Sequence, residues 1–298
     1  MNRRAFLLGL LATGCAAGGC TAGGPAAALS VAAGERGGMY FDFATLLAAQ
    51  LDPPGRVVET RGSLANLDLL GSGAAQVALT LADAVGAADP ALRLRALGRV
   101  YENYLQLVVR ADDPAQHVAD LAGRTVSLGA AGSGASLSGE RMLGTTGLAT
   151  SVRVEHYRLA DAVRALVDRR VDALLWSGGV PTPILAQVAD IRLLPLAEVL
   201  PGLRAAHGRV YEQVAVPAGV YGAPREVATI GVANLLVCRD SLPDTVAGAV
   251  TRTLVSRAAA LVPEQALGTQ FLDVRSLIGT TGLPLHPGAA AAYRDLHG

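Results

Sequence analysis

Glycine, hydroxyl and amide residues gather in five short turns, each of which follows an apolar run. A glycine-rich turn exposes backbone N–H groups, and a helix beginning there adds a partial positive charge, so such a turn can hold a small anion. One such turn is explained equally well by tight turning or by helix capping. Five of them are typical of a site where hydroxyls and N–H groups surround a small anionic ligand. The predicted ligand contacts are Arg36, Gly38, Met39 and Tyr40 in the first turn, Arg61, Ser63 and Asn66 in the second, Asp83 in the third, Ser133, Gly134 and Ser136 in the fourth, and Trp176, Gly178 and Gly179 in the fifth.

The residues that common enzyme reactions require are missing or badly spaced. All 25 residues counted as Lys+Arg are arginine, which excludes a lysine Schiff base and the lysine of a phosphate-binding P-loop. The glycine turns contain neither GxSxG nor GxGxxG. The five histidines lack metal-site spacing, and Cys238 follows an apolar run, as a buried thiol does. The sequence therefore predicts a protein that is not an enzyme and holds no metal or cofactor.

The composition suits a folded chain of two compact halves. The chain has 298 residues, of which 51% are hydrophobic and 17% charged, and its formal net charge is +0. At roughly 150 residues per domain, this length allows two lobes. A neutral chain lacks the positive charge that sequence-independent nucleic-acid binding requires, so nucleic acid is not an expected partner.

From Leu29 onward, short apolar runs alternate with longer helical stretches, which predicts an α/β fold with a parallel sheet. The strands are expected at 29–33, 57–60, 77–80, 105–110, 125–128, 152–156, 173–176, 191–194 and 230–237, and helices at 44–51, 136–143 and 160–168. Two segments, 104–110 and 229–239, each follow a polar turn without leading straight into a glycine-rich loop, so we interpret them as hinge strands. This predicts one lobe of residues 29–108 with 231–298, a second lobe of residues 109–230, and a ligand cleft between them.

The N-terminus is typical of an export signal. Arg3 and Arg4 precede an apolar segment, and small residues lead up to Cys20. The apolar segment is too short to cross a bilayer of ~30 Å, which takes ~20 residues. We therefore expect residues 1–20 to be a twin-arginine lipoprotein signal peptide, Cys20 to carry the lipid, and residues 21–28 to form a flexible tether. Cys15 is the alternative lipidation site.

A series of short motifs runs along the rest of the chain in a characteristic order. They are Gly37-Gly38-Met39-Tyr40-Phe41, Gly62-Ser63-Leu64-Ala65-Asn66-Leu67, Asp120-Leu121-Ala122-Gly123-Arg124-Thr125-Val126-Ser127 with Gly132-Ser133-Gly134, Val171-Asp172-Ala173 with Gly179-Val180-Pro181-Thr182-Pro183, Val216-Pro217-Ala218-Gly219-Val220-Tyr221, and Leu285-His286-Pro287-Gly288-Ala289. In this order they resemble the TAXI type of solute-binding subunit from tripartite ATP-independent periplasmic (TRAP) transporters.

This resemblance implies a two-lobed fold like that of type II periplasmic binding proteins, whose lobes close around the ligand. It implies a lipid-anchored protein on the extracytoplasmic face of the cell membrane. Such a protein captures a small organic acid, of the glutamate or dicarboxylate class, and delivers it to an integral-membrane, ion-coupled permease. The resemblance also adds Tyr221 to the predicted ligand contacts.

The chain departs from the family pattern at several of these positions. Arg36, Met39 and Arg61 stand where the family has small or hydroxyl residues, and Ala135 and Val180 replace a threonine and a histidine. The lost hydroxyls should weaken the usual contacts with the ligand. Either added arginine could instead pair with a carboxylate in bidentate fashion, or lie in solvent.

Three other functions are compatible with the same features. The chain could serve an ATP-driven importer, present a ligand-bound form to a receptor kinase, or act as a transferase on the same two-lobed plan. A neighbouring gene for a polytopic TRAP permease, rather than for an ATPase, would favour the TAXI-type solute-binding subunit over the subunit of an ATP-driven importer. Turnover of a bound acid would favour an enzyme.

We predict that Cys20 is acylated. Metabolic labelling with a fatty-acid analogue should mark the wild-type chain, and the label should disappear in Cys20→Ala because the thiol that carries the diacylglycerol is gone. Cys15→Ala is the matched control and should keep the label. Label that persists in Cys20→Ala and is lost in Cys15→Ala would contradict this assignment.

Overall fold

The computed structural model describes residues 28–263 and 272–297. The predicted signal peptide, with Cys15 and Cys20, and the tether up to residue 27 lie outside the described residues. Within the described ranges, no helix has the length and apolar character that a membrane crossing requires.

Ten strands and ten α-helices are found in the described part of the chain. The strands are β1 (Ser30–Ala32), β2 (Arg56–Val58), β3 (Val77–Leu81), β4 (Leu94–Arg110), β5 (Thr125–Ser127), β6 (Arg153–Glu155), β7 (Ala173–Gly178), β8 (Ile191–Leu194), β9 (Tyr211–Val216) and β10 (Val227–Arg239). The helices are α1 (Met39–Gln50), α2 (Ser63–Ser72), α3 (Ala82–Val85), α4 (Gly134–Thr145), α5 (Leu159–Val167), α6 (Pro183–Ala186), α7 (Leu200–His207), α8 (Asp244–Ser256), α9 (Val274–Leu277) and α10 (Pro287–His297).

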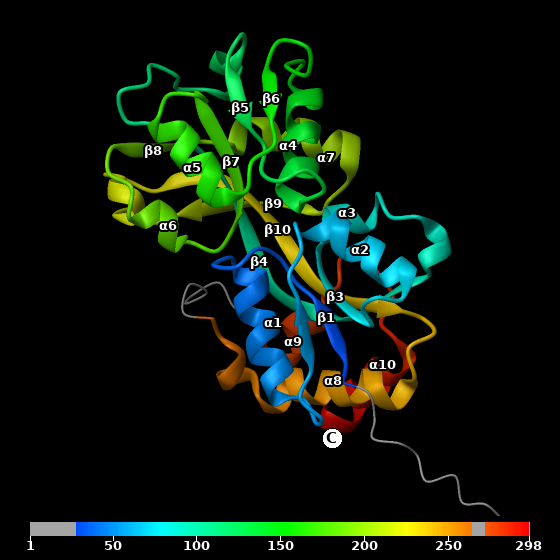
Figure 1. Ribbon diagram of the computed structural model, residues 1–298. Coiled ribbons are helices and arrows are strands. Elements are labelled where there is room, and N and C mark those ends of the chain that lie inside the picture. Colours follow the sequence, from blue (N-terminus) through cyan, green and yellow to red (C-terminus); the bar gives the residue numbers. More distant parts are fainter. Residues whose placement is uncertain (1–27, 264–271, 298) are drawn as a thin grey trace, which may run out of the picture.

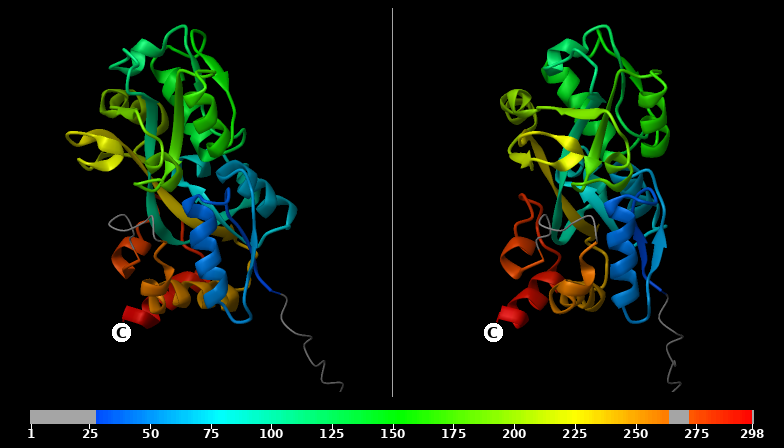
Figure 2. Two further views of the ribbon diagram at one scale, coloured as in Figure 1. Left: turned by 60° about the vertical axis from the view of Figure 1, so that its left-hand side comes forward. Right: turned by 90° about the vertical axis from the view of Figure 1, so that its left-hand side faces the viewer.

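These elements form two lobes, one above the other in Figure 1. The lower lobe contains β1–β3, α1–α3 and α8–α10, and the upper lobe contains β5–β9 and α4–α7, with the same division in the turned views of Figure 2. One sheet runs through both lobes in the order β2-β1-β3-β10-β4-β7-β5-β6, while β8 pairs with β4 and β9 with β10. Strands β4 and β10 belong to both lobes.

The sheet is mixed, so the predicted parallel sheet is only partly found. β1 pairs in parallel with β2 and β3, and β5 pairs in parallel with β6 and β7. β10 is antiparallel to β3, β4 and β9, and β4 is antiparallel to β7 and β8. The cause is that the chain rises to the upper lobe on β4 and returns on β10. The predicted lobe boundaries, and hinge motion about these two strands, stay predictions.

Two strands differ from the expected pattern. β4 begins at Leu94 rather than at residue 104, because Glu102, interpreted as part of a polar turn, lies 2.8 Å from Arg99 and pairs with Ala233 inside the ladder. β9 was not predicted at all. Its adjacent residues Glu212 and Gln213 are both exposed, so the strand lacks the alternation of apolar and polar residues that predicts a half-buried strand.

Three apolar clusters stabilise the lobes. The lower cluster, which includes Phe43 and Leu97, packs α1 and α8 on the sheet. The upper cluster includes Leu159 and Leu174. The shared cluster contains residues of both lobes, among them Leu81 and Met142. The two lobes are therefore joined by apolar packing as well as by β4 and β10.

Helices α8 and α10 approach so closely that Gly288 has no room for a side chain. A Cβ there would lie 2.1 Å from the backbone oxygen of Asp244. We expect Gly288→Ala to lower the free energy of unfolding by about 1–3 kcal/mol, measured by urea denaturation, because the helices must move apart. Gly144 in α4 has open space around it, so the control Gly144→Ala should raise stability by up to about 1 kcal/mol. Unchanged stability of Gly288→Ala would contradict the close helix packing.

Candidate functional site

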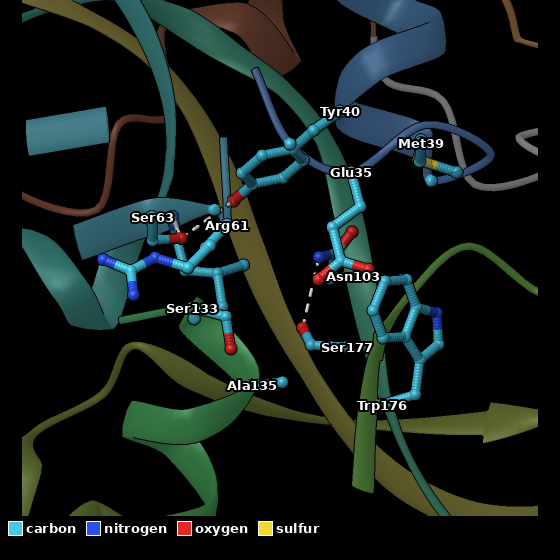
Figure 3. A pocket seen from close by; sticks show the side chains of 16 residues that line it. Glu35, Met39, Tyr40, Arg61, Ser63, Asn103, Ser133, Ala135, Trp176 and Ser177 are labelled. Atoms are coloured by element: carbon cyan, nitrogen blue, oxygen red, sulfur yellow. Dashed lines mark hydrogen bonds between the residues drawn. The ribbon is translucent and has the colours of Figure 1, made fainter. Parts of the chain in front are cut away.

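A pocket lies between the two lobes, where the strands that carry the predicted turns end (Figure 3). Its empty volume is about 440 Å³, a figure that includes space open to solvent. Its lining residues are Gly34, Glu35, Gly38, Met39, Tyr40, Arg61, Gly62, Ser63, Leu81, Asn103, Ser133, Gly134, Ala135, Trp176, Ser177 and Gly178. The three apolar clusters meet here, because Leu81 belongs to the shared cluster, Met39 and Tyr40 to the lower cluster, and Trp176 packs against the upper cluster.

Four of the five predicted turns contribute to this lining, and the third adds only Leu81, the last residue of the strand before it. Nine predicted contacts lie in it, namely Gly38, Met39, Tyr40, Arg61, Ser63, Ser133, Gly134, Trp176 and Gly178. The lining residues that the prediction omitted are Gly34, Glu35, Gly62, Leu81, Asn103, Ala135 and Ser177. Glu35 and Ser177 could have been chosen, since each lies inside a predicted turn. Asn103 gave no local signal, because it belongs to the middle of β4.

Two glycines allow the lobes to approach each other at the pocket. Gly62 precedes α2 with φ 121° and ψ −150°, a conformation that side chains disfavour. A Cβ on Gly134, the first residue of α4, would lie 2.4 Å from Leu81 Cδ1 and 2.7 Å from Ser63 Oγ. Glycine at these positions therefore lets the second and fourth turns, which come from different lobes, lie in contact.

The hydroxyl of Ser63 faces the pocket but already has protein partners. Its Oγ accepts a hydrogen bond from the backbone N–H of Leu81 at 3.0 Å and lies 3.2 Å from the Tyr40 hydroxyl (Figure 3). Only 1% of Ser63 is exposed. Ser63 therefore connects the turns that begin α1 and α2 to the end of β3, in addition to lining the pocket.

Asn66 was predicted as a ligand contact, but it does not line the pocket. Its Oδ1 accepts a hydrogen bond from Thr60 Oγ1 at 2.6 Å, and its Nδ2 donates to the backbone oxygens of Leu79, at 2.7 Å, and Ala33. The side chain is fully buried. Its amide thus ties β1, β3 and the second turn together behind the pocket.

Two charged residues predicted as ligand contacts also lie outside the lining. Arg36 is exposed, pairs with Glu59 at 2.9 Å and covers the ring of Phe41. Asp83 is buried, and its Oδ2 accepts hydrogen bonds from Ser138 at 2.7 Å and from the Tyr211 hydroxyl at 2.9 Å. Burial raises the pKa of Asp83, while these two hydrogen bonds oppose that rise. Asp83 therefore joins α3 of the lower lobe to α4 and β9 of the upper lobe.

The remaining three predicted contacts form hydrogen bonds within the upper lobe or with β4. Ser136 donates to Glu140 at 2.8 Å. The oxygen of Gly179 accepts from Thr182 Oγ1 at 2.7 Å, and the Tyr221 hydroxyl donates to Gln106 Oε1 at 2.6 Å. Gly179 and Tyr221 thus support the loop after β7, while the bond of Ser136 lies within α4. None of the three lines the pocket, so direct ligand contact has no geometric support for them.

Each lobe places an oxygen at the start of a helix in the other lobe. The backbone oxygen of Gly132 accepts hydrogen bonds from the N–H groups of Leu64, at 3.1 Å, and Ala65, at 3.2 Å, at the start of α2. Oε2 of Glu35 accepts a hydrogen bond from the N–H of Leu159, the first residue of α5, at 3.2 Å. Helix N-termini favour such oxygens. These bonds hold the lobes together at the pocket.

Only Glu35 and Arg61 carry formal charges among the lining residues. Burial raises the pKa of Glu35, while the Leu159 N–H and the nearby Arg158 oppose that rise. Arg61 makes no ion pair or hydrogen bond with the described residues, and in Figure 3 its guanidinium points away from Trp176. Within the described ranges, no group of three or more His, Cys, Asp and Glu side chains could hold a metal ion.

Two lining side chains have buried polar atoms without a hydrogen-bond partner. Asn103 donates its amide to Ser177 Oγ at 3.1 Å but leaves Oδ1 unpartnered, and only 3% of the residue is exposed. Trp176 leaves Nε1 unpartnered, and this atom lies on the far side of the indole from the other labelled side chains (Figure 3). Unpartnered buried polar atoms cost stability, so the acceptor of Asn103 is a candidate for a ligand N–H.

Comparison with known proteins agrees with this architecture. The NMT1-like family matches residues 31–296. A solved protein from Bordetella bronchiseptica RB50 is 15% identical, with a TM-score of 0.59 over 91% of this chain and 98% of that chain. A protein from Xanthomonas citri, solved bound to ATP, is 12% identical, with a TM-score of 0.52 over 90% of this chain and 95% of that chain. At this identity the structures show the fold alone, and the predicted fold class, a two-lobed α/β fold like that of type II periplasmic binding proteins, is confirmed, although its sheet is mixed.

The hydrogen bonds of Asn66 predict a structural role. Asn66→Ala should lower the free energy of unfolding by roughly 2–4 kcal/mol, because three buried partners lose their hydrogen bonds. Thermal and urea denaturation measure this change. Ser72→Ala, at the exposed end of the same helix, is the control and should change stability by less than about 0.5 kcal/mol. Wild-type stability together with lost ligand affinity in Asn66→Ala would instead make Asn66 a ligand contact.

Proposed function

The chain belongs to the NMT1-like family, and from this membership and the pocket we propose that the protein is an extracytoplasmic solute-binding protein that captures a small organic acid for a membrane transporter. The observation that carries the proposal is the pocket itself. Strand-end turns from both lobes line it, and together with Asn103 of β4 they bring hydroxyls, one side-chain amide and one arginine to a single small space. Ligand pockets in α/β proteins occur at this kind of position.

Arg61 is the residue best suited to hold the acid. Arg61 lines the pocket, and its guanidinium makes no ion pair or hydrogen bond with the described residues. A guanidinium offers paired N–H donors that match the two oxygens of a carboxylate. The hydroxyls of Tyr40 and Ser133 line the same pocket and can add hydrogen bonds. Glutamate and related dicarboxylates are the ligand class that the TAXI resemblance supports.

The transporter in this proposal is a TRAP-type permease. The order of the TAXI-like motifs supports this partner, and Cys20 would anchor the protein by lipid to the extracytoplasmic face of the membrane. Closure of the lobes on the ligand would give the permease a surface that the open form lacks. The cross-lobe bonds of Glu35 and Gly132 would form part of that closed state.

A solute should be detectable on the purified protein, and Trp176 should report its binding. Native mass spectrometry should show a co-purified small acid. Trp176 is the only tryptophan and lines the pocket, so its emission should shift in a saturable way when that acid is titrated into protein from which it has been removed. The midpoint should match the dissociation constant from calorimetry, because an indole reports the polarity around it.

Two controls separate binding from nonspecific effects. Ser72→Ala lies far along α2 from the lining and should bind like wild type. Arg61→Gln should weaken binding about ten- to a hundredfold, since a hydrogen bond to a charged group is lost. The proposal fails if no small molecule co-purifies and no organic acid gives a calorimetric signal. Unchanged Trp176 emission at full occupancy would place the solute elsewhere.

A further inference from the structure

The carboxylate of Glu35 lies in a pocket for which the resemblance implies an acidic ligand. The turn that carries it is closed by a hydrogen bond from Gly38 N–H to the Glu35 backbone oxygen at 3.1 Å. Oε2 accepts from Leu159 N–H, while the other carboxylate oxygen makes no hydrogen bond to the described residues. One acceptor oxygen of Glu35 is therefore free for a ligand.

The charges around Glu35 do not cancel its own. Arg158 is the nearby cation, but it already pairs with Glu59 at 3.2 Å, and Asp161 adds a further negative charge. Arg36, next in sequence, also pairs with Glu59. A second carboxylate placed near Glu35 would thus meet repulsion, since like charges in a partly buried site interact strongly.

Glu35 and Asn103 both offer acceptors to the same pocket. Asn103 Oδ1 is buried and unpartnered, as described above. Figure 3 shows the Glu35 side chain running toward Asn103 and Ser177, while the Arg61 guanidinium points to the opposite side of the view. The lining therefore presents acceptors at one side and one cation at the other.

We propose that Glu35 is the specificity-determining residue of this pocket, and that it selects an acid that also carries an ammonium or comparable N–H group. Arg61 takes the anionic end of the ligand, and Glu35 with Asn103 takes the N–H donors. A plain dicarboxylate is disfavoured because its second carboxylate faces Glu35. This inference rests on the proposed function and narrows the ligand class that the resemblance implies.

The test compares acids that differ only at one position. Calorimetry with alanine against pyruvate, and glutamate against 2-oxoglutarate, contrasts an ammonium with a ketone oxygen on the same skeleton, and succinate serves as a plain dicarboxylate. Of alanine and glutamate, the one that wild-type protein binds more tightly should have an affinity at least about tenfold higher than that of its keto analogue. A charge-assisted hydrogen bond changes an affinity by about tenfold. Succinate should bind more weakly than the same amino acid.

Two variants separate charge from structure. Glu35→Gln keeps an acceptor oxygen for the Leu159 N–H but removes the charge, so the preference for the amino acid should fall about ten- to a hundredfold while the melting temperature changes little. Glu155→Gln is the matched control. It also neutralises a carboxylate of the upper lobe, but Glu155 is exposed at the end of β6 and does not line the pocket, so the preference should stay.

Three results would overturn the inference. First, a keto acid or succinate binds wild-type protein as tightly as the best amino acid. Second, neither alanine nor glutamate binds. Third, Glu35→Gln keeps the preference for the amino acid. The proposed function fails separately, when native mass spectrometry finds no solute and no organic acid gives a calorimetric signal. A co-purified plain dicarboxylate would keep the proposed function and reject the role of Glu35.

Discussion

The antiparallel pairing of β4 with β10 is the constraint on which the pocket depends. It runs from Leu105 with Ile230 in the upper lobe to Leu94 with Arg239 in the lower lobe, so both lobes are built outward from one ladder. Parallel strands of both lobes then end toward the middle of that ladder, where Asn103 pairs with Val232. A slip of one residue would turn Asn103 to the other face of the sheet. Register therefore fixes the only lining residue that β4 supplies.

The contacts between lobes use backbone groups that could otherwise hold an anion. The first N–H groups of α2 donate to Gly132 and that of α5 donates to Glu35, so protein oxygens occupy both helix starts. These N–H groups are therefore not available to a ligand, so its selection depends on the side chains that line the pocket. Among the lining residues, those with formal charge are Glu35 and Arg61. The pocket thus offers a pair of oppositely charged side chains in place of free helix N-termini.

Local sequence patterns predicted the alternation of strands and helices and the turns that line the pocket, because those features depend on neighbouring residues. They could not separate Ser63 from Asn66. Both belong to the start of α2, yet Ser63 lines the pocket while Asn66 faces Ala33 and Leu79. Which side of a helix meets the pocket is decided by how it packs on the sheet. For the same reason Asn103 could not be found, since its neighbours Ser177 and Val232 are distant in sequence.

Glu35 and Arg36 show how one turn determines the charge of the pocket. These adjacent residues have opposite charges and opposite surroundings, because Glu35 meets the N–H of Leu159 while Arg36 meets Glu59 and Phe41 outside. Partners on neighbouring elements thus direct the acid inward and the base outward. Had the turn placed Arg36 inward, the pocket would hold two arginines and suit a dicarboxylate. Because Glu35 points inward and lies beside the unpartnered acceptor of Asn103, the pocket favours a ligand that carries N–H donors.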